Sequence, residues 1–200
     1  MRRPRRRAED TRAEILDTAE TLFRTHGVSG CSIAHIAQAL SMSPANVFKH
    51  FHSKVALADA ICERHICSMS ERVEALDLEG PAPDRLKTLA FGLMDLHMEA
   101  IAENHFMVEM IFYLSKTEIE SGKHYEKMIE TLFSDLIRHG VEAGIYHTSD
   151  PERSGRVAAA AFASVLHPVF LTRSARTEIA AQCGELVDLV NAALQNPLAK

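Results

Sequence analysis

The residues with the clearest chemical potential lie in the run SPANVFKHFHSKVAL, from Ser43 to Leu57. Its opening Ser-Pro predicts the N-cap and first position of a short helix, because proline lacks the N–H that this position leaves unpaired. Val47 and Phe51 are expected to face inward. The outward residues are then Ala45, Asn46, Phe48, Lys49 and His50. Asparagine can pair with adenine in the DNA major groove, a small side chain can contact a thymine methyl, and cations suit phosphates. The pattern predicts a helix that reads DNA.

Two further helices are expected to hold this reading helix in place. Residues 11–26 carry apolar side chains at helical spacing and end at Gly27, and residues 33–40 predict a short second helix capped by Ser32. Two short helices joined by a tight turn and braced by a longer helix form a helix-turn-helix. A fourth helix is predicted over residues 54–76.

The rest of the chain is also predicted to be helical. Amphipathic stretches at 84–104, 106–120 and 122–143 are followed by a mostly small or apolar segment at 152–174 and a last helix at 176–195. No stretch alternates polar and apolar residues with the period of a β-strand. The fold class expected is all-α, with a helix-turn-helix head and a larger helical body.

Charge is distributed unevenly along the chain. Residues 1–54 hold nine basic and five acidic side chains, a net charge of +4, whereas the remaining residues hold 13 basic and 22 acidic side chains, a net charge of −9. A basic head on an acidic body suggests that a polyanion binds the head alone.

Composition narrows the class of protein. Hydrophobic residues make up 46% of the chain and charged residues 24%, as in globular domains, which argues against disorder. The longest apolar stretch, Val157 to Leu171, is interrupted by Ser164, His167 and Pro168, so we expect no membrane span and no membrane partner. The basic N-terminus lacks the apolar segment of a signal peptide, which predicts a cytoplasmic protein.

The cysteines show neither disulfide-framework spacing nor a C-x-x-C pair, so free thiols are expected. Cys62 and His65 lie one helical turn apart and Cys67 follows, but the two cysteines point to different helix faces and no fourth ligand stands at a zinc-site spacing. We therefore expect no metal site and no cofactor. Redox sensing by Cys62, Cys67 or Cys183 stays open as an alternative.

Residues 11–57 resemble the DNA-binding domain of the TetR family of transcriptional regulators. The matching elements are RAEILDTAETLF at 12–23, Gly27, SIAHIA at 32–37 and, most specifically, the run from Ser43 to Leu57. The resemblance implies that Ser32 and Lys54 contact phosphate. It also implies that Ser43, Ala45 and Asn46 lie nearest the bases, and that Phe48, Lys49 and His50 lie against the backbone and nearby bases. Phe48 stands where the family commonly has tyrosine, so one phosphate hydrogen bond should be missing.

Two alternatives remain for the arginine-rich tail, Arg2 to Arg7: insertion into an adjacent minor groove, or non-specific electrostatic attraction. The architecture normally works as a two-fold homodimer. The small-residue surface from Ala158 to Ala163 and the apolar stripe at 179–194 are the predicted interface, forming a four-helix bundle, with internal core as the alternative.

The resemblance further implies a small-molecule effector, of unknown identity, bound among the middle helices. The candidate lining residues are polarisable, aromatic or imidazole side chains, namely Met94, His97, Met98, Phe106, Met107, Met110, Phe112, Tyr113, Phe162 and His167. For each of these residues taken singly, plain core is the favoured alternative. The domains expected are a basic arm and helix-turn-helix domain over 1–53, a connecting helix over 54–76 and an effector-binding and dimerisation domain over 77–200.

The function predicted is therefore a sequence-specific transcriptional regulator. It would be a repressor that a small molecule releases from a palindromic, double-stranded DNA operator. A non-specific architectural DNA-binding protein is one alternative, although the acidic body disfavours it. An all-helical enzyme is the other, but the chain lacks G-x-S-x-G, H-E-x-x-H, Walker and dinucleotide-binding motifs, so we expect no catalytic residues.

Overall fold

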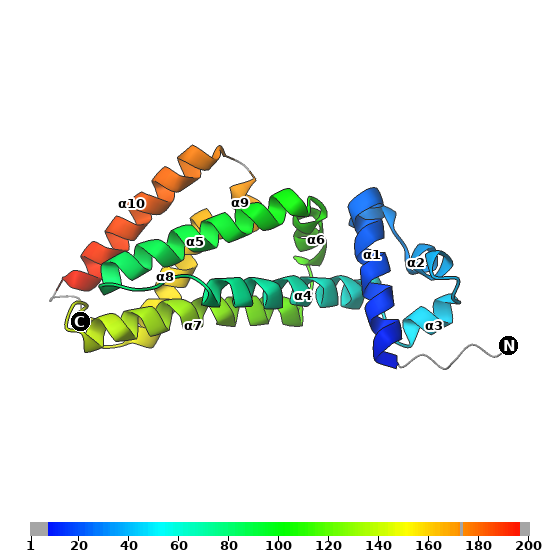
Figure 1. Cartoon of the computed structure of the whole chain (residues 1–200), viewed down its shortest axis with the longest axis horizontal. Helices are drawn as coiled ribbons and strands as arrows, with labels where there is room; N and C mark the ends of the chain where they lie inside the picture. Colours follow the sequence, from blue (N-terminus) through cyan, green and yellow to red (C-terminus); the bar gives the residue numbers. More distant parts are fainter. Residues whose placement is uncertain (1–7, 173, 197–200) are drawn as a thin grey trace. The chain divides into compact units, whose positions relative to one another are not determined.

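The computed structural model describes residues 8–172 and 174–196, which consist of α-helices and short connections with no β-strand among them (Figure 1). The predicted all-α class is confirmed. The tail from Arg2 to Arg7 lies outside the described residues. In chain order the helices are α1 (Ala8–Gly30), α2 (Ile33–Ala39), α3 (Pro44–Phe48), α4 (Lys54–Glu74), α5 (Ala82–Glu103), α6 (Phe106–Leu114), α7 (Glu120–Glu142), α8 (Pro151–Leu166), α9 (Pro168–Leu171) and α10 (Arg176–Gln195).

The chain forms two compact units. The head unit comprises the described residues up to His65 together with Asn104–Ser121, and the body unit comprises Ile66–Glu103 and the described residues from Gly122 onward. These units do not coincide with the boundaries expected at residues 53 and 77. Helix α4 is shared by both units, and α6 belongs to the head because its apolar face is buried there.

The head core is built from α1, α2, α3, the first part of α4 and α6. Phe23, Val47 and Ile61 are fully buried in it. Phe106 and Met110 of α6 join the same cluster, and α6 packs directly on α1. Sequence spacing alone assigned α6 to the body, since an apolar helical face does not name the surface that covers it.

Local sequence explains where the head helices begin and turn. Gly27 has φ 73°, a left-handed conformation that glycine tolerates, and it interrupts the helical path of α1. The hydroxyl of Ser43 accepts the N–H of Asn46 at 3.3 Å, and Pro44 occupies the first turn of α3. Ser41 has φ 53° in the connection between α2 and α3, so this turn uses a left-handed serine.

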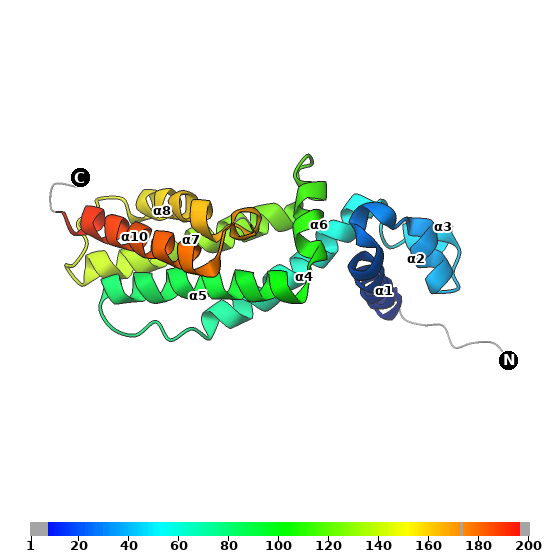
Figure 2. The same ribbon diagram turned by 90° about the horizontal axis from the view of Figure 1, so that it is seen from above.

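The body core lies among α5, α7, α8 and α10 (Figure 2). Phe133 and Phe162 stack with ring centroids 5.0 Å apart and planes 14° from parallel. A Cβ atom at Gly155 would lie 2.6 Å from the backbone of Ser134, so this glycine allows α8 to approach α7 closely. Helix α10 packs on both α5 and α8.

The mostly small or apolar segment over 152–174, predicted to be helical, is divided into α8 and α9. His167 has extended backbone torsions (φ −68°, ψ 132°), as expected for a residue before proline, and its side chain accepts the N–H of Val169 at 3.3 Å. By length and composition alone, Pro151–Leu171 would suffice to cross a membrane, although the sequence predicted no such segment. Core helices of globular proteins meet the same criterion, and α8 packs against α5, α9 and α10.

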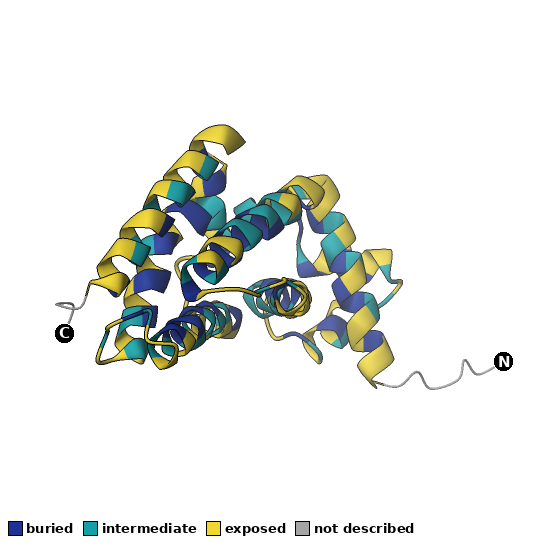
Figure 3. Ribbon diagram, turned by 60° about the vertical axis from the view of Figure 1, so that its left-hand side comes forward, coloured by how far each residue is buried: buried dark blue, intermediate teal, exposed yellow. Residues whose placement is uncertain are grey.

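The apolar stripe of α10, predicted as an interface, is instead internal. Ile179, Cys183, Val187 and Leu194 are buried in the body core. Figure 3 shows buried residues on one face of α10 and exposed residues on the other. The alternative of internal core is thus correct for these four residues, because the stripe supplies the face that α5 and α8 cover.

Candidate nucleic-acid interface

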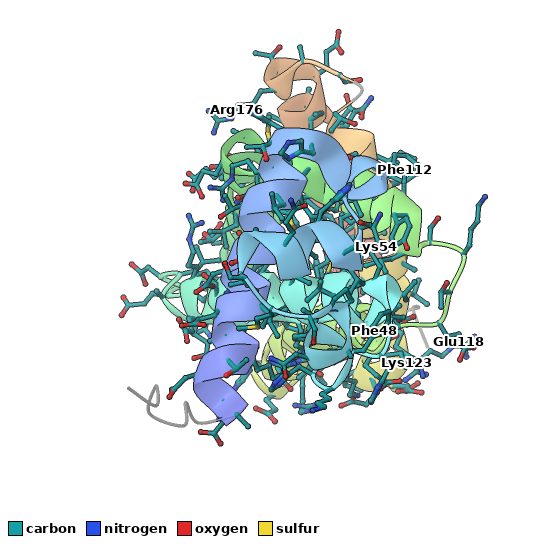
Figure 4. All side chains as sticks on the ribbon, turned by 90° about the vertical axis from the view of Figure 1, so that its right-hand side faces the viewer. Phe48, Lys54, Phe112, Glu118, Lys123 and Arg176 are labelled. Atoms are coloured by element: carbon teal, nitrogen blue, oxygen red, sulfur yellow. The ribbon has the colours of Figure 1, made fainter. Side chains whose placement is uncertain are left out.

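Helix α3 presents the surface that its sequence predicted. Ala45 and Lys49 are exposed, and Phe48 retains 44% of its accessible surface, whereas Val47 is buried. Asn46 and His50 are half-buried. Figure 4 views the head unit end-on and labels Phe48 and Lys54. Small, aromatic and cationic side chains are therefore available to a groove without any loss of core.

Asn46 is held in place within α3. Its Nδ2 donates to the sulfur of Met42 at 3.4 Å. Because the amide carries two hydrogens and a carbonyl oxygen, one donor and one acceptor remain for a base edge. This is the pair of groups that adenine requires in the major groove.

Lys54 lies at the start of α4 and is positioned from two sides. Its Nζ donates to the carbonyl oxygen of Ser29 at 3.4 Å and lies 5.1 Å from the ring centroid of Tyr113. The Ser53 hydroxyl caps α4 by accepting the N–H of Ala56 at 3.0 Å. A lysine at a helix N-terminus suits a phosphate, because the exposed N–H groups and the ammonium group both attract anions.

Ser32 and His35 cap α2 reciprocally. The Ser32 hydroxyl accepts the His35 N–H at 3.2 Å, and His35 Nδ1 accepts the Ser32 N–H at 3.3 Å. When neutral, His35 therefore carries its proton on Nε2 and can offer it to a phosphate. Sequence reasoning missed His35, although the Ser-x-x-His spacing of a capping box was its signal.

Helix α4 is joined to α1 by an ionic cluster. Arg64 contacts Glu20 and also donates to Asp17 at 2.6 Å, while Nε2 of His65 lies 3.3 Å from Glu20. The contact with His65, opposed by partial burial and aided by Arg64, lowers the pKa of Glu20 to about 2. The cluster fixes the first part of α4, and hence Lys54, relative to the head core.

The ten residues predicted to line an effector site fall into two groups. Met94, His97, Met98, Phe162 and His167 belong to the body unit, and Phe106, Met107, Met110, Phe112 and Tyr113 belong to the head unit. Within the second group Phe106 and Met110 are head core, Phe112 is 53% exposed and Tyr113 lies under Lys54. Helix α6 packs on α1, so its five residues are described with the head unit.

Within the body, His97 forms a buried polar pair that the sequence only half predicted. Its Nδ1 donates to the carbonyl oxygen of Leu93 at 2.7 Å, so Nε2 accepts the hydroxyl of Tyr125 at 2.9 Å. Burial lowers the pKa of His97 to about 4 and raises that of Tyr125, so both groups are neutral near pH 7. Tyr125 was missed because nothing in its own spacing distinguishes it from an exposed helical tyrosine.

The cysteines form no disulfide in the part of the chain that the structure describes. Cys31, Cys62 and Cys183 are buried and Cys67 is exposed. Burial raises the pKa of Cys62 to about 12 and that of Cys183 to about 11, which disfavours the reactive thiolate. Over residues 8–172 and 174–196, no three His, Cys, Asp or Glu side chains are grouped closely enough to hold a metal ion.

Two parts of the chain match models of known protein families. Residues 15–61 match the model of bacterial regulatory proteins of the tetR family, and residues 82–187, more than half of the chain, match the tetracyclin repressor-like C-terminal domain. The second match covers most of the body unit and also Asn104–Ser121 of the head unit, a part of the chain in which the sequence showed no motif.

Individual relatives are similar over part of their length. The chain is 31% identical over 103 residues to the HTH-type transcriptional regulator UidR of Escherichia coli K12. It is 30% identical over 83 residues to the probable HTH-type transcriptional regulator ArpR of Pseudomonas putida. The matches cover 48% and 38% of this chain, and 53% and 40% of those relatives.

The fold extends over nearly the whole chain. A TetR-family transcriptional regulator from Pectobacterium atrosepticum superimposes with a TM-score of 0.68 at 19% identity, covering 98% of this chain and 99% of that one. TetR-family proteins are transcriptional regulators, which sets aside the enzyme alternative. The helix-turn-helix in the head and the family match across the body lead to one conclusion: the chain belongs to the TetR family of transcriptional regulators.

Proposed function

We propose that the protein is a site-specific, dimeric repressor of transcription that acts in the cytoplasm and is released from a palindromic operator by a small molecule. The observation that carries the proposal is the exposed surface of α3. Asn46 offers a donor and an acceptor there, with Ala45 and Lys49 beside it. Base contacts from these residues would specify sequence, and Ser32, His35 and Lys54 would hold the backbone.

A homodimer is supported by the exposed faces of α8 and α10. Val157 and Leu189 keep 63% and 66% of their surface, unusual for large apolar side chains. Arg153 and Arg156 are exposed on α8, whereas Glu185 and Asp188 are exposed on α10. A two-fold axis that lays α8 of one copy against α10 of the other would bury the apolar residues and pair the opposite charges.

Release would follow from ligand binding in the body unit. Helix α4 contributes residues to both units, so a ligand that favours one position of its body half also biases its head half. A preference of about 1–3 kcal/mol for the non-binding arrangement changes operator affinity by about 5- to 150-fold. His97 and Tyr125 are the polar groups we assign to the ligand, with Met94, Met98, Phe162 and His167 as its apolar and aromatic surroundings.

Selection of duplexes from a random-sequence pool tests the DNA claim. We expect enrichment of an inverted repeat, with the purified chain protecting two half-sites. Recovery of unrelated sequences, each bound as weakly as the starting pool, would instead support an architectural binder.

A charge placed on the exposed face of α10 tests the dimer. Leu189→Glu should yield monomers by analytical ultracentrifugation, whereas Phe112→Glu, at another exposed apolar position in the head unit, should leave the dimer intact. Equal masses for both variants would contradict this interface.

A further inference from the structure

The backbone after α1's break has two N–H groups that the helix itself does not satisfy. Gly27 leaves helical geometry with φ 73° and ψ 161°, so the N–H groups of Val28 and Ser29 begin a new turn, like those at a helix N-terminus. Such groups need an acceptor from elsewhere in the chain.

The acceptor is a carboxylate about 80 residues away in the sequence. Glu109 of α6 takes the Val28 N–H on Oε2 at 3.0 Å and the Ser29 N–H on Oε1 at 2.8 Å. A Cβ atom at position 27 would lie 2.8 Å from Glu109 Oε2, so the glycine also gives the carboxylate room. Both oxygens of one side chain thus hold two consecutive peptide groups.

The same peptide segment holds Lys54. The carbonyl oxygen of Ser29 accepts from Lys54 Nζ at 3.4 Å, and the Tyr113 ring lies 5.1 Å from that nitrogen. Glu109 and Tyr113 stand four residues apart on α6, which places them on one helical face. The N–H groups and the nearby Lys54 charge lower the pKa of Glu109 against the effect of its partial burial, so the carboxylate is ionised at neutral pH.

We propose that Glu109 is a positioning residue for DNA binding: by clamping Val28 and Ser29 it sets the carbonyl group that orients Lys54 toward phosphate. The inference rests on the proposed DNA-binding function. It assigns an acidic side chain, outside the helix-turn-helix, a favourable part in binding a polyanion.

The sign of the effect separates this role from simple electrostatics. Removing a negative charge from a DNA-binding unit strengthens its binding to DNA if only the net charge matters. Removing a clamp weakens binding, because Lys54 then samples orientations away from phosphate. Glu109→Gln keeps the size of the side chain and one carbonyl acceptor, while it removes the charge and the second acceptor. Glu103→Gln, at the exposed last residue of α5 in the body unit, removes the same charge without touching the clamp and is the charge control.

The full chain is titrated with the duplex enriched from a random pool and with a scrambled duplex, at several salt concentrations. We expect Glu109→Gln to weaken binding to both duplexes by roughly tenfold. It should also flatten the salt dependence by about one unit of slope, as Lys54→Ala does. Glu103→Gln should bind as the wild type does or slightly more tightly.

A purely structural role is excluded by a double variant. In a Lys54→Ala background, Glu109→Gln should cost little further affinity, because both changes remove the same phosphate contact. Equal losses in both backgrounds with an unchanged salt slope would overturn the proposal, as would binding by Glu109→Gln that equals or exceeds the wild type.

The titration of the wild type shows whether a failure concerns site-specific DNA binding or only the positioning role of Glu109. If the wild type binds both duplexes equally, the proposal of site-specific regulation is wrong. The positioning role of Glu109 is then tested on the scrambled duplex, by comparing Glu109→Gln with Glu103→Gln. If neither duplex binds, both proposals are overturned.

Discussion

In the head unit the residues that would contact DNA lie outside the core, whereas in the body unit most residues that would meet an effector are part of the core. Ala45 and Lys49 project from α3 while Val47 supports them from within. Met94, His97 and Phe162 are themselves buried. Recognition and stability are therefore carried by different residues in the head and by the same residues in the body, and substitutions should separate the two cases.

The largest expected effect is on body stability. Phe162→Ala removes a ring stacked on Phe133 and should lower the free energy of unfolding by about 3–5 kcal/mol, whereas Phe48→Ala on α3 should change it by no more than about 0.5 kcal/mol. Denaturant titration of both variants measures the difference. A small loss of stability for Phe162→Ala would contradict the assignment of Phe162 to the close-packed core, because it would mean that the ring borders space that a ligand can fill.

Lowering the pH should destabilise the body unit at a higher pH than the head unit. His97 has an ordinary pKa of 6.5 and a folded pKa of about 4, so the unfolded chain takes up the proton first. Stability that is complete above pH 6.5 should fall by about 3 kcal/mol as the pH drops to 4. In the head unit, the pKa of Glu20 is lowered from 4.5 to about 2. The stability that ionised Glu20 contributes is therefore lost only as the pH falls between those values.

Region-resolved amide hydrogen exchange across this pH range measures the two losses separately. His97→Gln is the control, since it removes the titrating group and should flatten the loss between pH 6.5 and 4. Parallel loss of protection in both units would contradict the assignment to His97.

Base discrimination should depend on Asn46 with little effect on stability. Asn46→Ala removes one bidentate contact and should reduce the preference for the correct base by about 1–3 kcal/mol, while the cap from Ser43 to the backbone N–H of residue 46 is kept. Competition binding with single-base operator variants measures the loss at each position. A uniform loss across all variants would show that Asn46 does not read a base.

The smallest expected effect belongs to Lys54. Lys54→Ala should weaken binding to every duplex alike and lower the salt slope by about one, because phosphate contacts carry no sequence information. Titrations at several salt concentrations give the slope, and Lys116→Ala, an exposed lysine beyond α6, serves as the control. A loss confined to the operator duplex would assign Lys54 a base contact instead.

The sequence predicted the head more fully than the body for a physical reason. Caps such as Ser32 and Ser43, and the break at Gly27, are local signals, and the structure confirms them. The packing of α6 on α1 is a long-range contact, and no local pattern distinguishes Phe106 facing the head from Phe106 facing the body. Glu109 was invisible for the same reason, since its partners lie about 80 residues away.

The interface predicted on α10 also shows that a local sequence pattern does not identify which surface covers an apolar face. Its strongest apolar stripe, from Ile179 to Leu194, was predicted to meet a second copy, but it packs on the chain's own core. The surface left for a partner contains Leu189 next to Asp188 and one turn after Glu185, a weaker pattern that becomes visible only after the core is assigned. Hydrophobic periodicity identifies a buried face without identifying what buries it.

Site-specific DNA binding is tested by titrating the full chain with its selected duplex and with a scrambled duplex of equal length and composition, each at two salt concentrations. We predict that the selected duplex binds at least about a thousandfold more tightly and that this preference persists at the higher salt. Equal affinities that vanish together as salt rises would contradict the account, since electrostatic attraction to the head would then explain all of the binding.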